Sequence, residues 1–217
     1  MAISLHETCL EYFRRRLSEG WKCISLEGYN AVLLSPDGNI LRPVDFRNDV
    51  ETLRPNAAGD ETTLTPTAGA NWEMVDEAVA DEETTTVRSN NNAYRRDLYA
   101  LPNHTTEAGT INFVKIYFRC WGGSDDAGWA KPSQKSGIVV TDGTEVALTK
   151  DTWVTYSEQW DTNPEDSEAF EWADIDAFQI GISLKAAFDD VQRCTQVYVE
   201  VDFTPPAAGR SHGYIIG

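Results

Sequence analysis

The sequence has few of the residues on which many enzymes and membrane proteins depend. The 217-residue chain contains 3 His, 4 Cys and 2 Met, and it has 18 Lys and Arg against 35 Asp and Glu. No window is long and apolar enough to span a bilayer. The first 16 residues place Glu7, Glu11 and three consecutive arginines where a secretory signal needs an apolar core. We therefore expect a soluble protein that is made in a cytoplasm and has no membrane partner.

The shortage of basic residues argues against nucleic acid as a direct partner. The formal net charge is −17; residues 1–50 carry 6 Lys and Arg against 7 Asp and Glu, which leaves 12 against 28 for residues 51–217. Such an acidic region repels phosphate backbones. We interpret the charge mainly as a solvated surface that keeps the protein soluble. A surface made for Ca²⁺ or for a basic partner is the alternative.

The few cysteines and histidines show no spacing typical of a metal site or of a catalytic group. They are Cys9, Cys23, Cys120, Cys194, His6, His104 and His212. No CxxC pair, no nucleophile motif such as GxSxG and no phosphate-binding loop is present. With 35 carboxylates, a pair that resembles a glycosidase couple carries no information. We expect reduced, buried thiols, no cofactor and no enzymatic activity.

Three groups of aspartates offer oxygen ligands that Ca²⁺ accepts. They are Asp125 with Asp126, Asp189 with Asp190, and Asp174 with Asp176. None has the spacing of an EF-hand loop. We interpret them mainly as solvated turns and, for Asp174 and Asp176, as polar residues of a short helix. Ca²⁺ remains the one ion that the sequence suggests.

The N-terminus predicts an amphipathic helix. Residues 4–7, Ser-Leu-His-Glu, have the form of a capping box, and a helix from about Leu5 to Ser18 follows. Gly20 is a plausible end for this helix. One stripe recurs every four residues and is a candidate protein interface: Leu5, Cys9, Phe13 and Leu17.

Three short strands are expected next, over residues 21–26, 29–34 and 40–46. Pro43 restricts the third to a sheet edge, because proline has no backbone N–H. Residues 1–49 are few for an independently stable domain, so we expect this segment to dock on another surface. At the other end, residues 205–217 form a tail. Tyr214, Ile215 and Ile216 are either a frayed terminus or an anchor that pairs with a neighbouring subunit.

From Val50 the pattern changes to short strands separated by turn residues, which is typical of an all-β domain. Residues 110–121 and 195–203 alternate between apolar and polar positions, as antiparallel strands with one wet face do. The same alternation places Cys120 in the core and Cys194 toward solvent. Asp142-Gly143 predicts a tight hairpin between the strands on its two sides.

Residues 153–184 indicate one corner of a β-sandwich. A strand bounded by Trp153 and Trp160 ends at Asn163-Pro164. Helical spacing follows to Phe178, and period-two alternation then continues to Leu184. The fold class is therefore mainly β: an antiparallel β-sandwich over residues 50–204, with a small N-terminal helix and β-hairpin segment over residues 1–49.

Several motifs of the acidic domain resemble tailed-bacteriophage virion proteins. The motifs are Leu53-Arg54-Pro55-Asn56, Gly59-Asp60, Trp72, Val75-Asp76-Glu77, Asp81, Thr84-Thr85-Thr86-Val87, Trp160-Asp161-Thr162-Asn163-Pro164 and residues 172–182. The resemblance covers roughly residues 50–203. It implies a sandwich of the jelly-roll type and a structural or surface role on a virion. It carries over no catalytic or metal-binding residue.

Seven tryptophans raise a second hypothesis, because an exposed aromatic ring can stack on a sugar ring. Trp121 and Trp129 flank the glycine-containing segment 122–128 at an expected strand end, and they are the candidate glycan-binding residues. Packing is the competing interpretation for both. Four others are expected in the core: Trp72, Trp153, Trp160 and Trp172.

The sequence thus predicts a non-enzymatic virion structural protein that decorates or reinforces the capsid, or forms part of the neck or tail. Its partners would be other virion proteins and copies of itself. Residues 1–49 would provide the docking surface, and the acidic sandwich would project outward. The alternative is a carbohydrate-binding module that recognises a host-surface glycan through Trp121 and Trp129.

Overall fold

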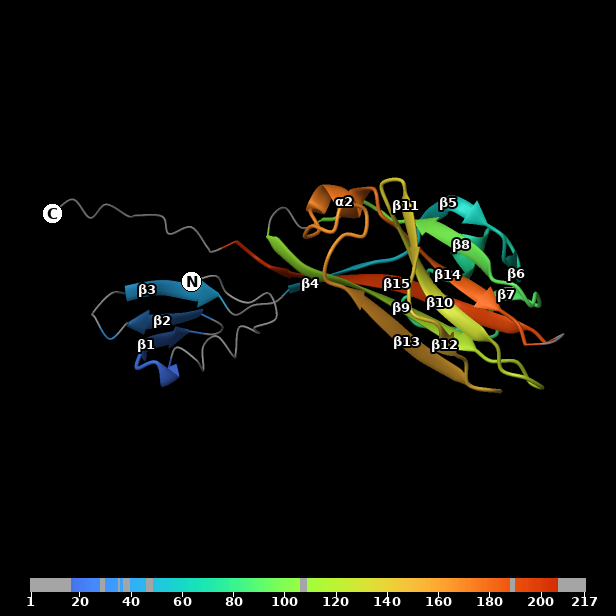
Figure 1. Ribbon diagram of the computed structural model, residues 1–217, viewed down its shortest axis with the longest axis horizontal. Coiled ribbons are helices and arrows are strands. Elements are labelled where there is room, and N and C mark those ends of the chain that lie inside the picture. Colours follow the sequence, from blue (N-terminus) through green and yellow to red (C-terminus); the bar gives the residue numbers. More distant parts are fainter. Residues whose placement is uncertain are drawn as a thin grey trace. The chain divides into compact units, whose positions relative to one another are not determined.

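The computed structural model describes residues 17–27, 30–34, 36, 40–45, 49–105, 109–187 and 190–206. The chain divides into two compact units (Figure 1). The first contains residues 1–49, 108–110 and 204–217, and the second contains residues 50–107 and 111–203. Each unit is described separately below.

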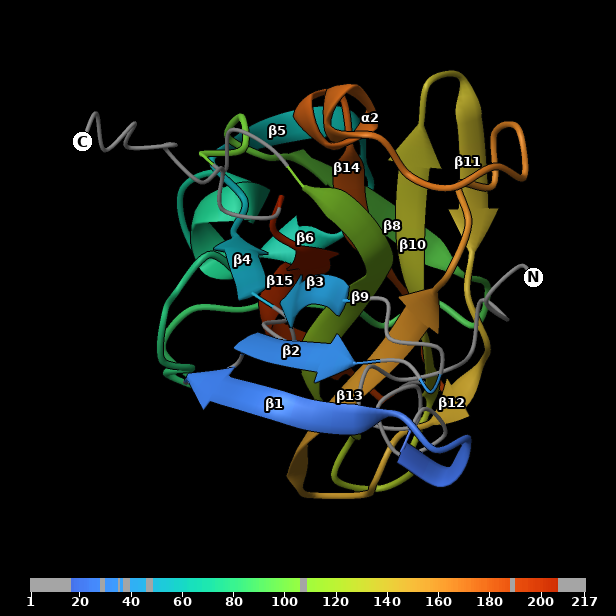
Figure 2. The ribbon, with the colours of Figure 1, turned by 90° about the vertical axis from the view of Figure 1, so that its left-hand side faces the viewer.

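The first unit contains a three-stranded antiparallel sheet. Its strands are β1 (Lys22–Glu27), β2 (Asn30–Leu34) and β3 (Ile40–Asp45), in the order β1-β2-β3 (Figure 2). Leu34 of β2 faces Lys22 on one side and Ile40 on the other. The three expected strands are confirmed. Pro43 lies on the edge strand β3, as a residue without a backbone N–H requires.

Most of the expected N-terminal helix lies outside the described residues. Of its interface stripe, Leu5, Cys9 and Phe13 are outside them, as are Tyr214, Ile215 and Ile216 of the tail. Leu17 is helical and 41% exposed. Gly20 has φ of +85° and donates its N–H to the Leu17 carbonyl, 3.2 Å away. The expected helix end at Gly20 is therefore confirmed.

The second unit is a β-sandwich of two antiparallel sheets, as predicted (Figure 1). The β10 sheet has the order β11-β10-β14-β8-β5, and β12 also pairs with β10. Its strands are β5 (Ala57–Thr62), β8 (Arg95–Ala100), β10 (Trp129–Ser136), β11 (Val139–Asp142), β12 (Val146–Ala147) and β14 (Gln179–Lys185). The β9 sheet has the order β13-β9-β15-β7-β6, and β4 also pairs with β15. Its strands are β4 (Asp49–Leu53), β6 (Thr65–Pro66), β7 (Val87–Ser89), β9 (Thr110–Trp121), β13 (Trp153–Trp160) and β15 (Gln192–Thr204).

The core lies between the two sheets and is built by alternating residues of the long strands. Those of β9, β14 and β15 are fully buried: Val114, Ile116, Phe118, Cys120, Ile180, Ile182, Leu184, Val197, Val199 and Val201. Burial of each such aliphatic or aromatic side chain contributes roughly 1.5–3 kcal/mol. The expected alternation of residues 110–121 and 195–203 is confirmed.

Two short helical segments close the sandwich: η1 (Asn71–Met74) and α2 (Trp172–Asp176). Ile175 of α2 is fully buried, and Phe170 packs edge-on against Phe178 at 5.8 Å between ring centroids. Asp174 accepts the Glu171 N–H at 2.8 Å and so caps the first turn. The expected short helix between two strands is confirmed, and Asp174 and Asp176 are residues of it, as expected.

The hairpin expected at Asp142-Gly143 is wrong. β11 and β12 do not pair with each other; both pair with β10. The tight turn is at Gly137-Ile138, where Ser136 faces Val139 and Gly137 has φ of +52°. Gly143 instead donates its N–H to the Pro132 carbonyl at 2.7 Å. Asp142-Gly143 is thus an interruption in the strand opposite β10.

The expectation that Cys194 faces solvent is also wrong, because this side chain is fully buried. Buried positions of β15 are even-numbered at Gln192 and Cys194 and odd-numbered from Val197 onward. Burial does not alternate from Cys194 to Val197, because Thr195 and Gln196 between them are buried as well. Cys194 therefore reaches Cys120, and burial together with this contact raises the pKa of the Cys120 thiol. Both thiols are unbridged and buried, whereas Cys23 is exposed rather than buried.

Candidate functional site

The outer surface of the β10 sheet carries charged and polar side chains on neighbouring strands. Ile180, Ile182 and Leu184 point into the core, so the odd-numbered residues of β14 point outward. On β10 the outward positions start at Trp129 and continue at every second residue to Lys135. We define the polar face as the outward residues of β8, β10 and β14, together with Asp60, Glu61, Asp142 and Glu145.

Strand register arranges this face in rows that cross the strands. Trp129 of β10 faces Lys185 of β14, and Lys135 faces Gln179. Between these rows, Ser133 faces Gly181, and Ser183 faces Arg96 of β8. Because successive outward residues on a strand are about 7 Å apart, the face extends about 20 Å from Trp129 to Lys135.

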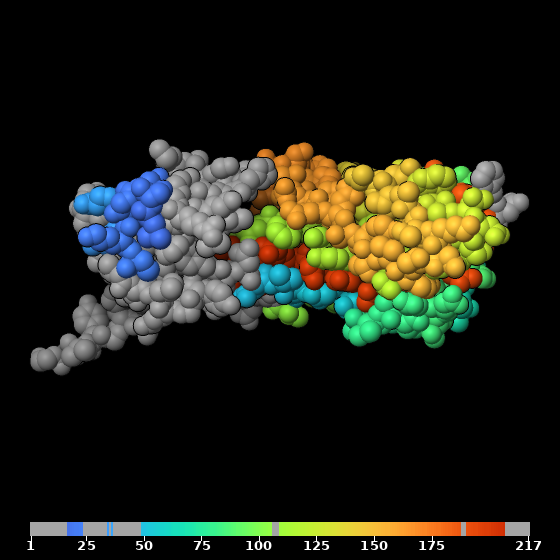
Figure 3. Space-filling model, turned by 90° about the horizontal axis from the view of Figure 1, so that it is seen from below, coloured from blue at the N-terminus to red at the C-terminus, as the bar shows by residue number. Residues whose placement is uncertain are grey.

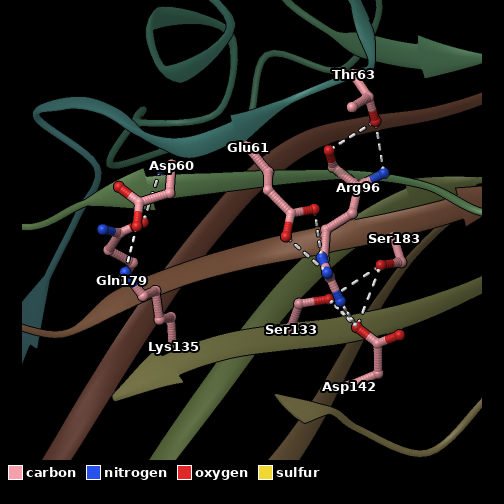
Figure 4. A network of polar contacts seen from close by, with 9 residues as sticks. All are labelled: Asp60, Glu61, Thr63, Arg96, Ser133, Lys135, Asp142, Gln179 and Ser183. Atoms are coloured by element: carbon pink, nitrogen blue, oxygen red, sulfur yellow. Dashed lines mark hydrogen bonds and ion pairs between the residues drawn. The ribbon is translucent and has the colours of Figure 1, made fainter. Parts of the chain in front are cut away.

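Arg96 is the centre of the hydrogen-bonded network on the polar face (Figure 4). Its guanidinium donates to Glu61 at 2.7 and 2.9 Å and to Asp142 at 2.9 Å. Asp142 also accepts the Ser133 hydroxyl at 2.7 Å, and Ser133 is 3.0 Å from the hydroxyl of Ser183. These bonds connect five strands, β5, β8, β10, β11 and β14, and they hold the planar groups in fixed orientations.

A second set of contacts covers the other end of the face (Figure 4). Lys135 forms an ion pair with Asp60, and Gln179 accepts the Asp60 N–H at 2.9 Å. The hydrogen bond from Lys135 holds the pKa of Asp60 below its usual value.

Leu98 lies on the outward side of β8 and outside the core cluster, yet it is only 1% exposed. The polar side chains therefore cover a small apolar floor.

The opposite end carries aromatic rings and two lysines, and we call it the aromatic end: Tyr94, Trp129, Lys131, Lys185 and Glu145. The Lys185 ammonium lies 4.1 Å from the Trp129 ring centroid and 5.0 Å from that of Tyr94. The Lys131 ammonium is 4.5 Å from the Tyr94 centroid. The Tyr94 hydroxyl donates to Glu145 at 2.6 Å. Burial and this bond raise the pKa of Tyr94, so the phenol stays a donor.

The structure places the two candidate tryptophans on different sheets. Trp129 begins β10 and is half-buried on the polar face. Trp121 ends β9, is only 9% exposed and has the Arg193 guanidinium 4.9 Å from its ring centroid. Trp153 is directly opposite Trp121 and, like it, points away from the core, because the neighbouring Cys120 points inward. The expected core position of Trp153 is therefore wrong. Three other tryptophans pack against the core as expected: Trp72, Trp160 and Trp172.

Aromatic rings also lie on the outer surface of the β9 sheet, but they pack on each other. Tyr117 and Tyr198 stack at 4.8 Å with an interplanar angle of 7°. The Arg54 guanidinium lies over Tyr198 at 4.7 Å, and the Lys115 ammonium is 5.0 Å from the Tyr117 centroid. Burial and a bond to Glu200 raise the pKa of Tyr117 to about 12. Figure 3 shows the molecule from the side on which β13, the edge strand of this sheet, is seen in orange-yellow.

The one described histidine has a structural environment. His104 Nδ1 is 2.7 Å from Asp176 Oδ1, and the backbone N–H of His104 donates to the same oxygen at 3.0 Å. Its ring stacks on Trp172 at 4.9 Å. These contacts join residues 101–105 to α2. The bond from His104 lowers the pKa of Asp176.

Of the aspartates suggested for Ca²⁺, Asp189 lies outside the described residues, and Asp190 has backbone partners. Asp190 accepts the N–H groups of Asp125 and Asp126 at 2.7 and 3.0 Å, so its carboxylate organises that loop. Across the described ranges, no group of three or more His, Cys, Asp or Glu residues is placed to hold a metal ion. Nor does any helix in the described part of the chain have the length and hydropathy to cross a membrane.

Comparison with known proteins gives structural neighbours only. No protein-family model and no curated protein matches the chain. The C-terminal CBM6 of LamC, a marine laminarinase from Zobellia galactanivorans, matches with 13% identity and TM-score 0.40, over 70% of this chain and 98% of that one. A xylan-binding module, CBM15, matches with 15% identity and TM-score 0.38, over 74% of this chain and all of the module.

A viral protein is also among the neighbours. The enzymatically active domain of tailspike protein 4 from bacteriophage CBA120 matches with 10% identity and TM-score 0.35, over 71% of this chain and 19% of that one. All three identities are below 25% and all three TM-scores are below 0.5. No function can be transferred to this chain from such likenesses, because unrelated functions share the sandwich fold.

Proposed function

We propose that this protein binds carbohydrate on the polar face of the β10 sheet. The observation that carries the proposal is the combination of the aromatic end with a row of planar polar side chains, all on strands of one sheet or directly beside them. A sugar ring has an apolar face that packs on an aromatic ring and hydroxyls that need donors and acceptors. Trp129 would take the first role; Arg96 and Gln179 would take the second.

The polar face can exchange its internal contacts for ligand contacts at small cost. A cation over an exposed aromatic ring contributes about 0.5–1 kcal/mol. An exposed ion pair contributes about 0–1 kcal/mol, and both partners of the Lys135–Asp60 pair reach solvent. A ligand that replaces these contacts therefore does not have to break the core. The outer surface of the β9 sheet fits less well, since Tyr117 and Tyr198 already stack on each other.

A glycan array probed with the full chain tests the proposal, followed by Trp129→Ala against any glycan that binds. We expect at least a tenfold loss of affinity, or about 1.4 kcal/mol. Trp153→Ala is the matched control, because Trp153 is a half-buried outward tryptophan of the other sheet. A flat array would refute the proposal, and so would equal loss in both variants.

We propose a second role, as a structural protein of a phage virion, which the resemblance of residues 50–203 supports together with the separate first unit. Residues 1–49 would dock on other virion proteins or on copies of this chain, and the glycan-binding face would then serve host-surface adhesion. Deleting residues 1–46 should abolish incorporation into particles and leave the sandwich folded. Normal incorporation of the truncated protein would contradict this role.

A further inference from the structure

The charges on the polar face are unevenly neutralised. Four basic side chains lie on it, although the chain as a whole has a net charge of −17. Arg96 is bound by two carboxylates, those of Glu61 and Asp142. Lys135 is bound by Asp60. These two cations therefore have their counter-charges within the protein.

The aromatic end has an excess of positive charge. Lys131 has no carboxylate within 4 Å among the described residues, and Lys185 has only Glu145, at 3.7 Å. Glu145 is already the acceptor of the Tyr94 hydroxyl at 2.6 Å. One carboxylate thus faces two ammonium groups, and both of these groups lie over aromatic rings. The hydrogen bond from Tyr94, together with the nearby lysines, lowers the pKa of Glu145.

From this geometry we infer that the preferred ligand of the polar face is an acidic glycan, in which a sugar carboxylate binds Lys131 and Lys185 while the sugar ring stacks on Trp129. The inference rests on the proposed function, since it names the class of glycan for the same site. Lys185 lies 4.1 Å from the Trp129 centroid, so a ring that stacks there displaces its ammonium. A carboxylate on that ring gives the displaced ammonium a charge-assisted hydrogen bond. A neutral sugar offers no such replacement.

Uronic acids and sialic acids both carry this carboxylate, and a probe pair for each separates the two sources. The first pair is tri-galacturonate and its carboxyl-reduced counterpart; the second is sialyllactose and lactose. Short oligosaccharides are used because a long polyanion would be repelled by the acidic protein as a whole. Isothermal titration calorimetry with the full chain should show at least tenfold tighter binding of the acidic member of one pair.

The lysine variant is Lys131→Met combined with Lys185→Met, because methionine keeps an unbranched apolar stem against the rings. It should remove the preference for the acidic member and bring the two affinities within about twofold. Lys115→Met is the matched control, since it removes an ammonium over Tyr117 on the other sheet, and it should leave the preference unchanged. Circular dichroism melting checks that the variants remain folded.

The outcomes separate the inference from the proposed function. Equal affinity for acidic and neutral probes, with loss in Trp129→Ala, would overturn the inference and leave carbohydrate binding intact. Binding of no array glycan and of neither probe pair would overturn both. A preference for the acidic probe that survives in the double lysine variant would also overturn the inference, because the carboxylate would then be bound elsewhere.

Discussion

The buried carboxylate of Asp97 should be one of the most sensitive polar groups in the sandwich. It lies on β8 with no exposed surface. One oxygen accepts the N–H groups of Thr63 and Leu64 at 2.6 and 2.8 Å. The other accepts the Asn71 amide at 2.6 Å and the Tyr99 hydroxyl at 3.2 Å. Asp97 therefore attaches the segment between β5 and η1 to the central part of the β10 sheet.

The expected cost of Asp97→Ala follows from these four bonds. The Leu64 N–H and the Tyr99 hydroxyl are buried, and each would lose its partner at about 1–3 kcal/mol. Asn71 keeps a bond to the Leu64 carbonyl at 2.9 Å. Removing a buried carboxylate also removes its desolvation cost, which offsets part of the loss. We expect the free energy of unfolding to fall by about 3 kcal/mol.

Asp97→Asn separates hydrogen bonding from packing. The amide oxygen can still accept both backbone N–H groups, while the amide nitrogen faces two donors and loses about one bond. We expect a fall of about 1 kcal/mol. Asp125→Ala is the control, because Asp125 is exposed, and it should stay within about 0.5 kcal/mol of the parent.

Urea unfolding followed by tryptophan fluorescence measures the change in the free energy of unfolding of the sandwich. Six of the seven tryptophans belong to the second unit, so the signal reports mainly on the sandwich. Equal stability of the alanine variant and the parent would refute the reasoning. So would an asparagine variant as unstable as the alanine variant, since the two backbone bonds would then contribute nothing. Glycan affinity should also fall in Asp97→Ala, because Glu61 is in β5, directly before the Thr63 and Leu64 N–H groups that Asp97 binds.

Long alternating strands and the short helix could be predicted from the sequence, because their side-chain periodicity is local. Residues 110–121 and 178–184 show it directly. The hairpin at Gly137 could not be predicted, since an exposed apolar residue, Ile138, stands in its turn. The inward position of Cys194 could not be predicted either, because burial stops alternating from Cys194 to Val197 and no residue there marks the change.

The candidate site was predicted only in part, for a topological reason. The sequence indicates Trp129 because it follows a glycine-containing loop. No local pattern indicates Tyr94 or Lys185 as members of the site, although the alternation that ends at Leu184 places Lys185 on the outward side. The three meet only because β14 lies between β10 and β8 in the sheet. Strand order depends on the packing of the whole domain, so residues far apart in sequence come together without a local signal.

Three further predictions concern the sheets and their charges. Lys135 is the main cause of the lowered pKa of Asp60. The Asp60 carboxylate therefore contributes to the free energy of unfolding above pH 3.8, and this contribution is lost as the pH falls below that value. In Lys135→Met, the free energy of unfolding measured in urea should fall less between pH 7 and pH 3 than it does in the parent. Gly181→Ala should destabilise the β10 sheet by about 1–3 kcal/mol, since a Cβ there would clash with the carbonyl oxygen of Asp97 on β8. An unchanged melting temperature would contradict this close approach. Tyr117 should ionise near pH 12 in an absorbance titration, and Tyr117→Phe should remove that step. The pKa of Tyr117 is about 12 in the folded protein and near 10 in the unfolded chain, so its contribution to the free energy of unfolding is complete below pH 10 and is lost as the pH rises to 12. An absorbance step for Tyr117 near pH 10 would show that burial and Glu200 do not hold the phenol proton.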